Sequence, residues 1–524
     1  MKNTKIIISI IVLSLGLGGC TDWLSIRPEG QTVLDDFWKS ESQATSVLAS
    51  CYKGLSNYGC MERMLVWGEV RSDNVVSGMA IASNLDLAKV LSQNISPTNV
   101  YADWASFYSV INYCNTFLHY APGVMNSDQN FTLAKLHALE SEALAIRALC
   151  YFYLVRAYKD VPLVLEPSIN DTQDYAVAKA KEREILDQII SDLLTAKKYA
   201  RVEYSKGEYN KGRFTLTSIN ALLADVYLWD GQYANCVDAC NSVLADNTLA
   251  LVAGEDVISD VFYKGNSTES IFELQFDKKD IQYNYLTANM YGIISSEIAA
   301  ALSFPKFLTR AGDYSPFNYA ASAVKESQND IRETNFYGTT VNGTGYSIYK
   351  YALSQCVLNS DQTVTPVYRS SGSTTNWIVY RKSDVLLMKA EALVQLNNGD
   401  NGLKEALHMV NTTYSRSNMT SDTLQFSNYS DRGAMEKLVL RERQRELMFE
   451  GKRWFDLMRL VRRNNNSSSV ILSYISPKLS GNVLSKNKLS VIDALYMPIP
   501  KSELDVNPNL VQNPFYENTS TQSY

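Results

Sequence analysis

Histidine is scarce in this chain. Only three of the 524 residues are histidines, and they lie far apart, at His119, His137 and His408. Histidine-based metal sites usually take their ligands at short, regular spacings, so the sequence predicts neither such a site nor a cofactor. Basic residues form no stripe, and the formal net charge is −6. Nucleic acid is therefore not an expected partner.

Long apolar runs are missing after residue 20. A transmembrane helix needs about 20 predominantly apolar residues, and no later segment approaches that length. The N-terminus does carry a shorter apolar run, residues 6–17, which follows Lys2 and Lys5 and precedes two glycines and Cys20. A charged start, a short apolar stretch and a small-residue processing site are typical of a signal peptide. The sequence therefore predicts an exported protein.

The end of that segment, residues 17–20 (LGGC), resembles a bacterial lipobox, in which the cysteine thiol is acylated and becomes the first residue of the mature protein. We therefore predict that residues 1–19 are a lipoprotein signal peptide, that Cys20 is lipidated, and that residues 20–35 form a tether. Acyl chains would hold the protein on a membrane and not across it. An ordinary secretory signal with a chance cysteine is the alternative.

Seven further cysteines remain, and an odd number cannot all pair. Most lie in apolar helical contexts and are interpreted as small core residues. Cys51 and Cys60 are close enough in sequence to bridge a short loop, although sequence alone does not establish the geometry of a disulfide. The seven are Cys51, Cys60, Cys114, Cys150, Cys236, Cys240 and Cys356.

Apolar residues recur at steps of three and four over several segments, which predicts a mostly α-helical fold. Small residues and turn glycines in residues 221–243 and 385–410 match tetratricopeptide-type helix–turn–helix pairs, in which two antiparallel helices approach closely. Strict 34-residue periodicity is absent. We therefore expect an α-superhelical scaffold of degenerate tetratricopeptide-like pairs, with further helices over 40–56, 101–120, 133–158, 179–200 and 435–463.

The middle of the chain differs. Residues 261–376 are rich in Ser, Thr, Asn, Gly and Tyr, and they show little helical period. Long segments of this kind are usually functional surfaces or disordered, and the many tyrosines argue against disorder. We therefore predict a single domain over 36–524, helical over 36–260 and 377–524, with an insertion of short strands and loops between them that binds the ligand.

Aromatic residues suggest where a ligand binds. The chain has 33 tyrosines, and sugars stack on aromatic faces while fixed polar groups bind their edges. Tyr283 and Tyr285 are two residues apart, so on a strand they would face the same side. Burial is the competing role for each tyrosine, and closing a turn is the competing role for the Asp73–Asn74 pair. The candidate ligand-binding residues are Trp67, Asp73, Asn74, Tyr283, Tyr285, Tyr291, Tyr314 and Tyr319.

Three glutamates, Glu442, Glu446 and Glu450, lie four residues apart and hence on one helix face. A glycosidase would use two carboxylates as acid and base, but a helix face leaves no room for a sugar between them. Arg445 and Arg453 lie three residues after Glu442 and Glu450, at the right reach to neutralise them. We interpret this helix as a structural ion network and predict that the protein is not an enzyme.

Several short motifs follow one another along nearly the whole mature chain. They are residues 37–44 (FWKSESQA), 147–155 (RALCYFYLV) with 160–164 (DVPLV), 213–215 (RFT) with 221–228 (ALLADVYL), 381–392 (RKSDVLLMKAEA), 442–453 (ERQRELMFEGKR) and the tail motifs 498–500 (PIP), 507–508 (NP) and 512–514 (QNP). Each motif alone is weak, but the ordered set behind a lipobox is specific. Together these motifs resemble the SusD/RagB family of outer-membrane nutrient-binding lipoproteins.

The resemblance implies a lipoprotein of the outer membrane that binds a glycan, either an oligosaccharide or a polysaccharide. It also implies a partner, a SusC-like TonB-dependent transporter barrel, to which the ligand is delivered without chemistry. Two alternatives stay open at this point: a peptide-binding lipoprotein of the same architecture, and a tetratricopeptide-type adaptor for other proteins. A peptide site would depend more on backbone-facing amides and charges than on stacked rings.

Overall fold

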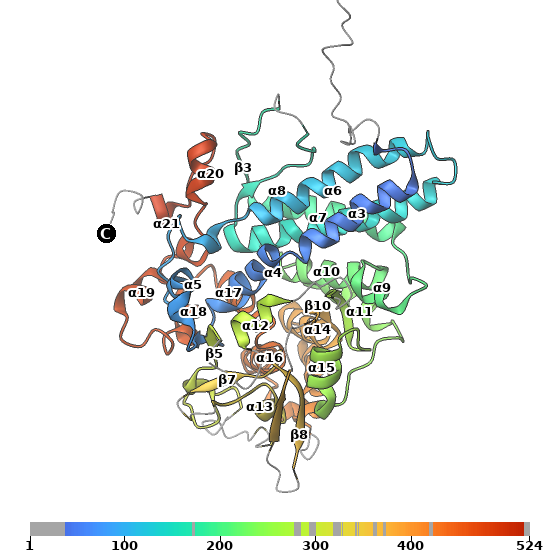
Figure 1. Ribbon diagram of the computed structural model, residues 1–524. Coiled ribbons are helices and arrows are strands. Elements are labelled where there is room, and N and C mark those ends of the chain that lie inside the picture. Colours follow the sequence, from blue (N-terminus) through green and yellow to red (C-terminus); the bar gives the residue numbers. More distant parts are fainter. Residues whose placement is uncertain are drawn as a thin grey trace, which may run out of the picture.

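The computed structural model describes residues 37–169, 173–276, 284–292, 300–317, 326, 329–340, 343, 345–359, 364–369, 374–418 and 423–517. Helices dominate this part of the chain (Figure 1). None of the helices described is both long enough and apolar enough to span a bilayer. The predicted signal peptide, Cys20 and the whole of the predicted tether, residues 20–35, lie outside the described residues.

The described α-helices of the first half are α3 (Glu41–Leu55), α4 (Tyr58–Leu65), α5 (Leu85–Leu91), α6 (Ala105–Val124), α7 (Leu133–Tyr158), α8 (Glu182–Tyr199), α9 (Gly207–Gly212), α10 (Leu216–Trp229) and α11 (Tyr233–Leu244). Those of the second half are α12 (Tyr285–Tyr291), α13 (Arg332–Asn335), α14 (Lys382–Leu396), α15 (Gly399–Ser417), α16 (Arg432–Leu447), α17 (Arg453–Arg463), α18 (Ser469–Ile475), α19 (Val483–Lys488), α20 (Lys501–Val506) and α21 (Pro514–Glu517).

Helix α7 is the centre of the upper layer, where it packs against α3, α6 and α8 (Figure 1). It begins after Thr132, whose side chain accepts a hydrogen bond from the Lys135 amide, and it ends at Lys159, whose φ is 71°. These bounds confirm the predicted helix over 133–158. The helix predicted over 101–120 begins later, at Ala105, because Asn99 caps a separate 3-10 turn before it.

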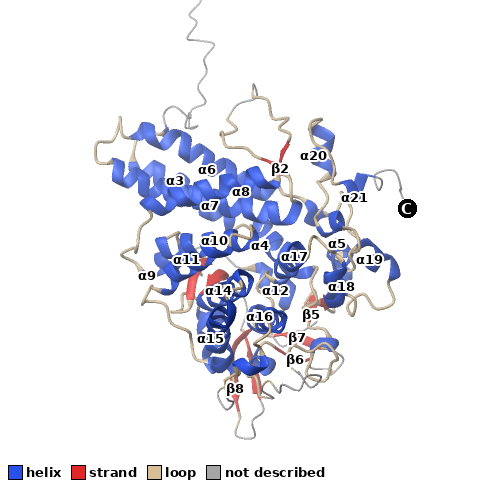
Figure 2. Ribbon diagram, turned by 180° about the vertical axis from the view of Figure 1, so that it is seen from behind, coloured by secondary structure: helices blue, strands red, loops and turns tan. Residues whose placement is uncertain are grey.

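Two helix pairs build the layer below. Helices α10 and α11 form one pair, α14 and α15 form the other, and α11 packs against α14 (Figure 2). Left-handed residues permit the tight turns: Gly231 (φ 74°) between α10 and α11, and Asn397 (φ 53°) and Gly399 (φ 65°) between α14 and α15. The predicted mostly helical fold built on helix pairs is confirmed.

The insertion consists of short strands and loops, as predicted, although α12 and α13 add helical turns within it. Its two ends are joined, because β4 (Ser270–Leu274) pairs antiparallel with β10 (Trp377–Arg381) and both strands are buried. The remaining antiparallel pairs are β1 (Val76–Ser77) with β5 (Leu302–Ser303), β2 (Val161–Pro162) with β3 (Lys179–Ala180), β6 (Tyr337–Thr339) with β7 (Tyr346–Ile348), and β8 (Leu353–Leu358) with β9 (Val364–Tyr368).

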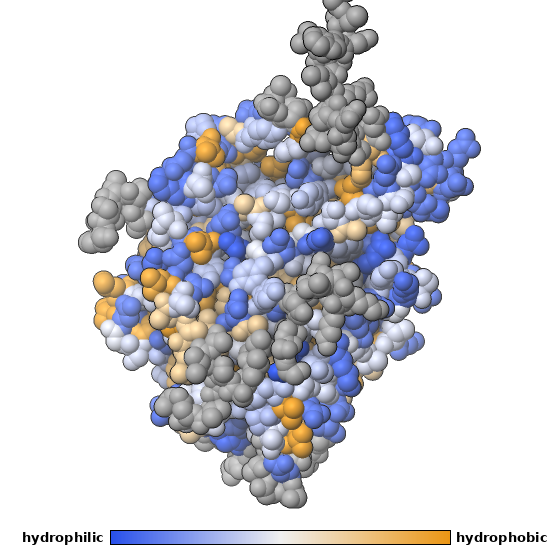
Figure 3. Space-filling model, viewed as in Figure 1, coloured by the Kyte–Doolittle hydropathy of each residue, from blue (hydrophilic) through white to orange (hydrophobic). Residues whose placement is uncertain are grey.

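One large apolar core runs through the upper layer, the first helix pair and the insertion, and a smaller one lies among α14, α15 and α16. Large aromatic side chains fill much of this core, among them Trp38, Trp104, Trp229, Trp377 and Trp454. Tyr349 and Tyr351 are buried as well. On the face shown in Figure 3 the surface is mostly hydrophilic, with hydrophobic side chains in separate small patches.

All seven described cysteines are free thiols, and all except Cys356 are buried. The proposed bridge between Cys51 and Cys60 is therefore not formed in this structure. The interpretation of the cysteines as small core residues fits their burial.

Candidate functional site

The three glutamates of α16 and the turn after it are fully enclosed. Glu442, Glu446 and Glu450 are each no more than 3% exposed. Arg381 reaches two of them, with Nη1 2.6 Å from Glu446 Oε1 and Nη2 2.7 Å from Glu450 Oε1. Lys350 Nζ lies 2.6 Å from Glu450 Oε1. These carboxylates are surrounded by cations and protein atoms.

Of the two arginines predicted to neutralise these glutamates, one does so and the other does not. Arg445 Nη1 does pair with Glu442 Oε2, at 3.2 Å. Arg453 does not pair with Glu450, because it donates to Asp73 instead, with Nε 2.8 Å from Oδ1. The charge of Glu442 is further compensated by Arg332 Nη1 at 2.7 Å, a residue of the insertion that local spacing could not indicate.

Burial and the neighbouring arginines shift the pKa values of these glutamates in opposite directions. Burial alone would raise the pKa of Glu446, but Arg416, Arg381 and other cations hold that pKa well below its usual value. For Glu442 the penalty of burial prevails and its pKa is raised. A general acid must reach the oxygen of the bond that it breaks, and these side chains are closed off from solvent. The network is structural, as predicted.

Trp67, Asp73 and Asn74 are all buried, so the prediction that they contact a ligand is wrong. The Trp67 indole donates to the Tyr101 carbonyl oxygen at 2.8 Å and stacks on Phe107. Asp73 is held by Arg453, and the Asn74 amide donates to Glu69 Oε1 at 2.8 Å. The polar run after Trp67 looks like an exposed turn in sequence, but its side chains satisfy distant buried groups.

Tyr291 is also a core residue, because it is 2% exposed and its hydroxyl donates to the Phe449 carbonyl oxygen at 2.7 Å. Its predicted contact with a ligand is therefore wrong. Tyr283 and Tyr319 lie outside the described residues. Tyr285 and Tyr314 are exposed, at 58% and 55%, so each presents a ring to solvent.

Tyr285 does not lie on a strand. It begins α12, because the Asn284 side chain accepts from the Thr287 amide and caps the helix there. On the same short helix, the Asn289 side chain donates to the Tyr58 hydroxyl of α4 at 3.4 Å. The Asn289 carbonyl oxygen accepts from the Ala301 amide, next to β5. Tyr285 thus stands on a helix that is fixed to both α4 and β5.

Tyr314 lies in the loop after β5. Its amide donates to the Phe307 carbonyl oxygen, and the two rings meet edge to face with centroids 6.2 Å apart. The contact holds the backbone of the loop while more than half of the Tyr314 side chain stays exposed. These two tyrosines are the predicted ligand-binding residues that the structure places on the surface.

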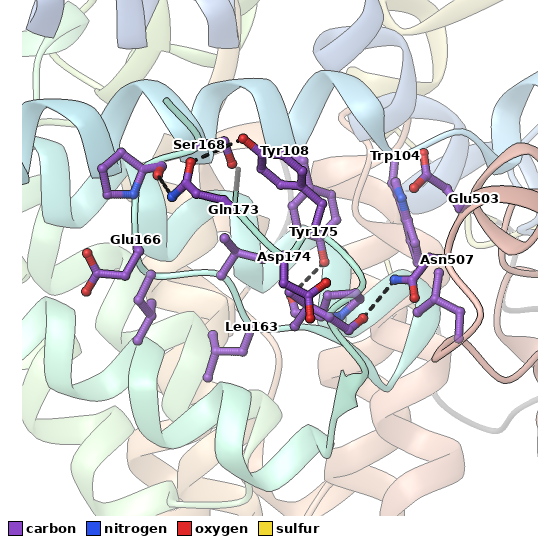
Figure 4. A pocket seen from close by; sticks show the side chains of 16 residues that line it. Trp104, Tyr108, Leu163, Glu166, Ser168, Gln173, Asp174, Tyr175, Glu503 and Asn507 are labelled. Atoms are coloured by element: carbon purple, nitrogen blue, oxygen red, sulfur yellow. Dashed lines mark hydrogen bonds between the residues drawn. The ribbon is translucent and has the colours of Figure 1, made fainter. Parts of the chain in front are cut away.

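A second surface was not predicted from the sequence. Between β2 and β3 a long loop crosses the start of α6 and encloses, with α20, a hollow of about 330 Å³ (Figure 4). We call it the Tyr175 cleft. It is lined by Trp104 and Tyr108 of α6, by residues 162–168, 173–175 and 177 of the loop, and by Glu503, Asn507 and Leu510.

Specific hydrogen bonds hold the loop in place. The Asn507 amide donates to the Val177 carbonyl oxygen at 2.9 Å, and the Gln173 amide donates to the Pro167 carbonyl oxygen at 2.9 Å. The Tyr175 hydroxyl donates to Gln173 Oε1 at 3.1 Å, which orients a ring that is 52% exposed. Tyr175 and Tyr108 both line the cleft (Figure 4).

The cleft is acidic. Its ionisable lining residues are Glu166, Asp174 and Glu503, and none of the described residues that line it is basic. Burial raises the pKa of Glu503, the nearby charge of Asp103 raises it further, and a hydrogen bond from Trp104 opposes both. Among the described residues, no cluster of three or more acidic, histidine or cysteine side chains has the geometry to hold a metal ion.

Comparisons with known proteins cover nearly the whole chain. A family model described as the SusD family matches residues 203–516. A second model, described as starch-binding and associating with the outer membrane, matches residues 22–228. The two matches together extend over residues 22–516, which includes both helix pairs, the insertion and the Tyr175 cleft.

Individual relatives agree with these matches. The chain is 26% identical over 488 residues to SusD-like protein P38 of Formosa agariphila, which covers 87% of this chain and 91% of that protein. It is 22% identical over 485 residues to a SusD-like protein of Bacteroides ovatus, with 87% and 82% covered. Among solved structures, a SusD homolog from Bacteroides thetaiotaomicron has a TM-score of 0.70 at 18% identity and covers 92% of this chain and 100% of that chain. B. fragilis NanU has a TM-score of 0.65 at 21% identity, with 94% and 100% covered.

Proposed function

The chain belongs to the SusD family, and from this premise we propose that it binds an oligosaccharide or polysaccharide at the cell surface without catalysis. It then delivers the glycan to a TonB-dependent transporter barrel of the outer membrane. The observation that carries the proposal is the match to a model described as starch-binding and associating with the outer membrane, over residues 22–228.

Two exposed tyrosines supply the proposed contacts. A sugar ring presents C–H groups on its faces and hydroxyl groups at its edges, so an exposed aromatic ring with polar neighbours is a suitable surface. Tyr285 stands beside Asn289 on the short helix α12, and Tyr314 lies on an anchored loop. Tyr283 and Tyr319 stay in the proposed set on their sequence positions alone.

The burial of the three glutamates beside α16 is consistent with a binding role. Glu442, Glu446 and Glu450 are buried among cations. Retaining and inverting glycosidases both need two carboxyl groups on either side of the scissile bond, roughly 5 to 9.5 Å apart. The enclosed α16 network offers a substrate no access to such a pair.

Membrane attachment is proposed to come from Cys20. Two acyl signals give stable anchoring where a single chain binds only reversibly, and an acylated N-terminus of this kind would hold the protein beside its transporter. The segment between Cys20 and α3 would then act as the tether predicted from the sequence.

The test is a glycan array, with a peptide library in parallel, on the chain from residue 21 onward. The described structure begins at residue 37, so this form keeps all of it. The site is examined with Tyr285→Ala and Tyr314→Ala. Tyr199→Ala serves as the matched control, because it removes another exposed tyrosine (44% exposed), at the end of α8.

Saturable binding to one glycan class, weakened by Tyr285→Ala or Tyr314→Ala and unchanged by Tyr199→Ala, is the expected result. Glycan binding that survives both variants would leave the function and remove these two residues from the site. Binding to peptides alone would replace the proposed function by that of a peptide-binding lipoprotein of the same architecture.

A further inference from the structure

The Tyr175 cleft has the composition of a binding site and is built from parts of the chain that are far from the tyrosines discussed above. Its walls come from α6, the β2–β3 loop and α20. Tyr285 and Tyr314 belong to the insertion. The loop is fixed on both sides of Tyr175, by Gln173 to Pro167 and by Asn507 to Val177.

The exposed ring of Tyr175 is oriented before any ligand arrives. Its hydroxyl is engaged by Gln173 Oε1 at 3.1 Å, and the same oxygen accepts from the Ile169 amide at 2.8 Å. Orienting an aromatic side chain in advance lowers the entropy that binding costs. The ring therefore offers a fixed, half-exposed face to the cleft.

Hydrogen-bond acceptors lie around that ring. Asp174 uses Oδ1 to accept from the Ala176 amide at 2.9 Å, and its other carboxylate oxygen has no hydrogen-bond partner among the described residues. Glu503 lies at the opposite wall beside Trp104 (Figure 4). Carboxylates accept hydrogen bonds from hydroxyl donors, and hydroxyl groups are what the edges of a sugar present.

The hollow continues beyond the cleft. A shallower depression of about 280 Å³ shares Trp104, Tyr108, Ser168 and Glu503 with it and adds Asn112 of the next turn of α6. The cleft itself, at about 330 Å³, is at the lower end of the roughly 300–1,000 Å³ range of ligand sites. The two hollows together form a groove that suits a short linear segment better than a large compact ligand.

We propose that the Tyr175 cleft is a second saccharide-binding site, which takes an uncharged stretch of an oligosaccharide with one ring stacked on Tyr175 and its hydroxyls donating to Asp174 and Glu503. The choice of a glycan as ligand rests on the proposed function. The proposal of an uncharged ligand rests on the cleft itself. Its three carboxylates repel sulfate and uronate groups, and the described part of its lining contains no basic side chain.

The test is isothermal titration of the chain from residue 21 onward. The neutral probes are oligosaccharides of glucose, mannose and xylose, and the anionic probes are oligogalacturonate and a sulfated galactose oligosaccharide. To isolate the cleft, each variant is made in a Tyr285→Ala/Tyr314→Ala background. The variants are Tyr175→Ala, Tyr175→Phe and Asp174→Asn, with Tyr199→Ala as the control.

A neutral probe is expected to bind this background about tenfold more weakly after Tyr175→Ala and three- to tenfold more weakly after Asp174→Asn. Tyr175→Phe keeps the ring but removes the hydrogen bond to Gln173 that orients it, so it should weaken binding less than Tyr175→Ala does, which separates stacking from a folding defect. Asp174→Asn keeps the shape of the side chain and serves the same purpose. Anionic probes are expected to bind at least tenfold more weakly than the neutral one.

Two results would overturn the cleft as a site. In the first, the background binds a neutral probe with an affinity that none of the three cleft variants changes. In the second, the unaltered chain binds glycan and the background binds none. Failure of the unaltered chain to bind any glycan contradicts the proposed function instead, and so the two failures are distinguishable. Preference for an anionic probe would contradict the charge argument.

Discussion

Arg381, at the end of β10, is the cation whose loss should cost the fold most. Its side chain is fully buried and joins three carboxylates of different segments. Its Nη1 lies 2.6 Å from Glu269 Oε1 and 2.6 Å from Glu446 Oε1, and its Nη2 lies 2.7 Å from Glu450 Oε1. Replacing it with methionine keeps an apolar stem and removes the charge and the six hydrogen bonds that the Arg381 side chain donates.

The expected loss of stability depends on which cations remain beside the three carboxylates. After Arg381→Met, Glu450 still has Lys350, and Glu446 and Glu269 still have Arg416. The carboxylates are therefore left partly compensated. Breaking a buried ion pair from one side costs about 3–5 kcal/mol, and we expect Arg381→Met to lower the free energy of unfolding by that amount. A natural protein has roughly 5–15 kcal/mol in total.

Urea unfolding followed by circular dichroism measures this loss through the midpoint, with the slope of the transition compared between variants. Lys501→Ala is the control, because it breaks an exposed pair, Lys501 with Asp505 at 2.7 Å, which should change stability by less than about 1 kcal/mol. The double variant Arg381→Met/Glu450→Gln should lose about 0.5–3 kcal/mol less than the sum of the two single losses, because Arg381 and Glu450 are direct partners and their shared interaction can be lost only once. A loss no larger than that of the control, or a double variant with additive losses, would refute the reasoning.

Three more predictions concern other parts of the fold. Burial lowers the pKa of Lys478 to about 7, so between pH 7 and 9 the unfolded chain binds more protons than the folded one. The free energy of unfolding should then rise with pH by up to about 1.4 kcal/mol per unit, and equal slopes for the unaltered chain and Lys478→Met in urea titrations would contradict this. Gly68→Ala should destabilise by several kcal/mol, roughly the upper range of single substitutions, because a Cβ there would lie 1.8 Å from the Gly451 carbonyl oxygen. Gly123→Ala, where a Cβ meets nothing within 4 Å, should instead stabilise by up to about 1 kcal/mol; thermal melts that show similar shifts for the two would count against the packing argument. Burial raises the pKa of the Cys150 thiol well above its usual value, so it should react with a disulfide reagent only after unfolding. Peptide mapping separates it from the partly buried Cys356, and rapid labelling of Cys150 itself in the native chain would show the thiol to be accessible.

The helices could be predicted because their information is local. Apolar residues at steps of three and four, a threonine cap and a left-handed stop define α7 within a short stretch of chain. The same is true of the two helix pairs, whose turns carry Gly231 and Gly399. The exceptions are short. Residues 100–102 form a separate 3-10 turn before α6, and Tyr285 begins a helix and not a strand. The helix predicted over 435–463 is broken, because α16 ends at Leu447 and α17 begins at Arg453, so Glu450 lies in the turn between them and not on the predicted helix face.

The candidate site was harder to predict because exposure depends on distant partners. The residues after Trp67 are polar and look accessible, but Asp73 pairs with Arg453, 380 positions away. Glu69 accepts from the amides of Phe449 and Gly451, equally far along the chain. No local pattern reveals such pairs. Tyr175 was not among the predicted residues, although it is exposed. The only local signal for it was the presence of polar neighbours, Gln173 and Asp174, in a long loop between two helices.

The pairing of β4 with β10 brings the two ends of the insertion together. The strands that begin and end it are hydrogen-bonded neighbours, with Leu274 opposite Trp377, so the intervening hundred or so residues leave the helical scaffold and return to it side by side. The entropy of closing a loop grows only slowly with its length, so the exposed loops of this segment can change in length at little cost. Its buried cations cannot be lost so cheaply, because Arg332 and Lys350 pair with Glu442 and Glu450 beside α16. An insertion transplanted at this junction would therefore have to bring two such cations with it, or leave buried carboxylates of the scaffold short of partners.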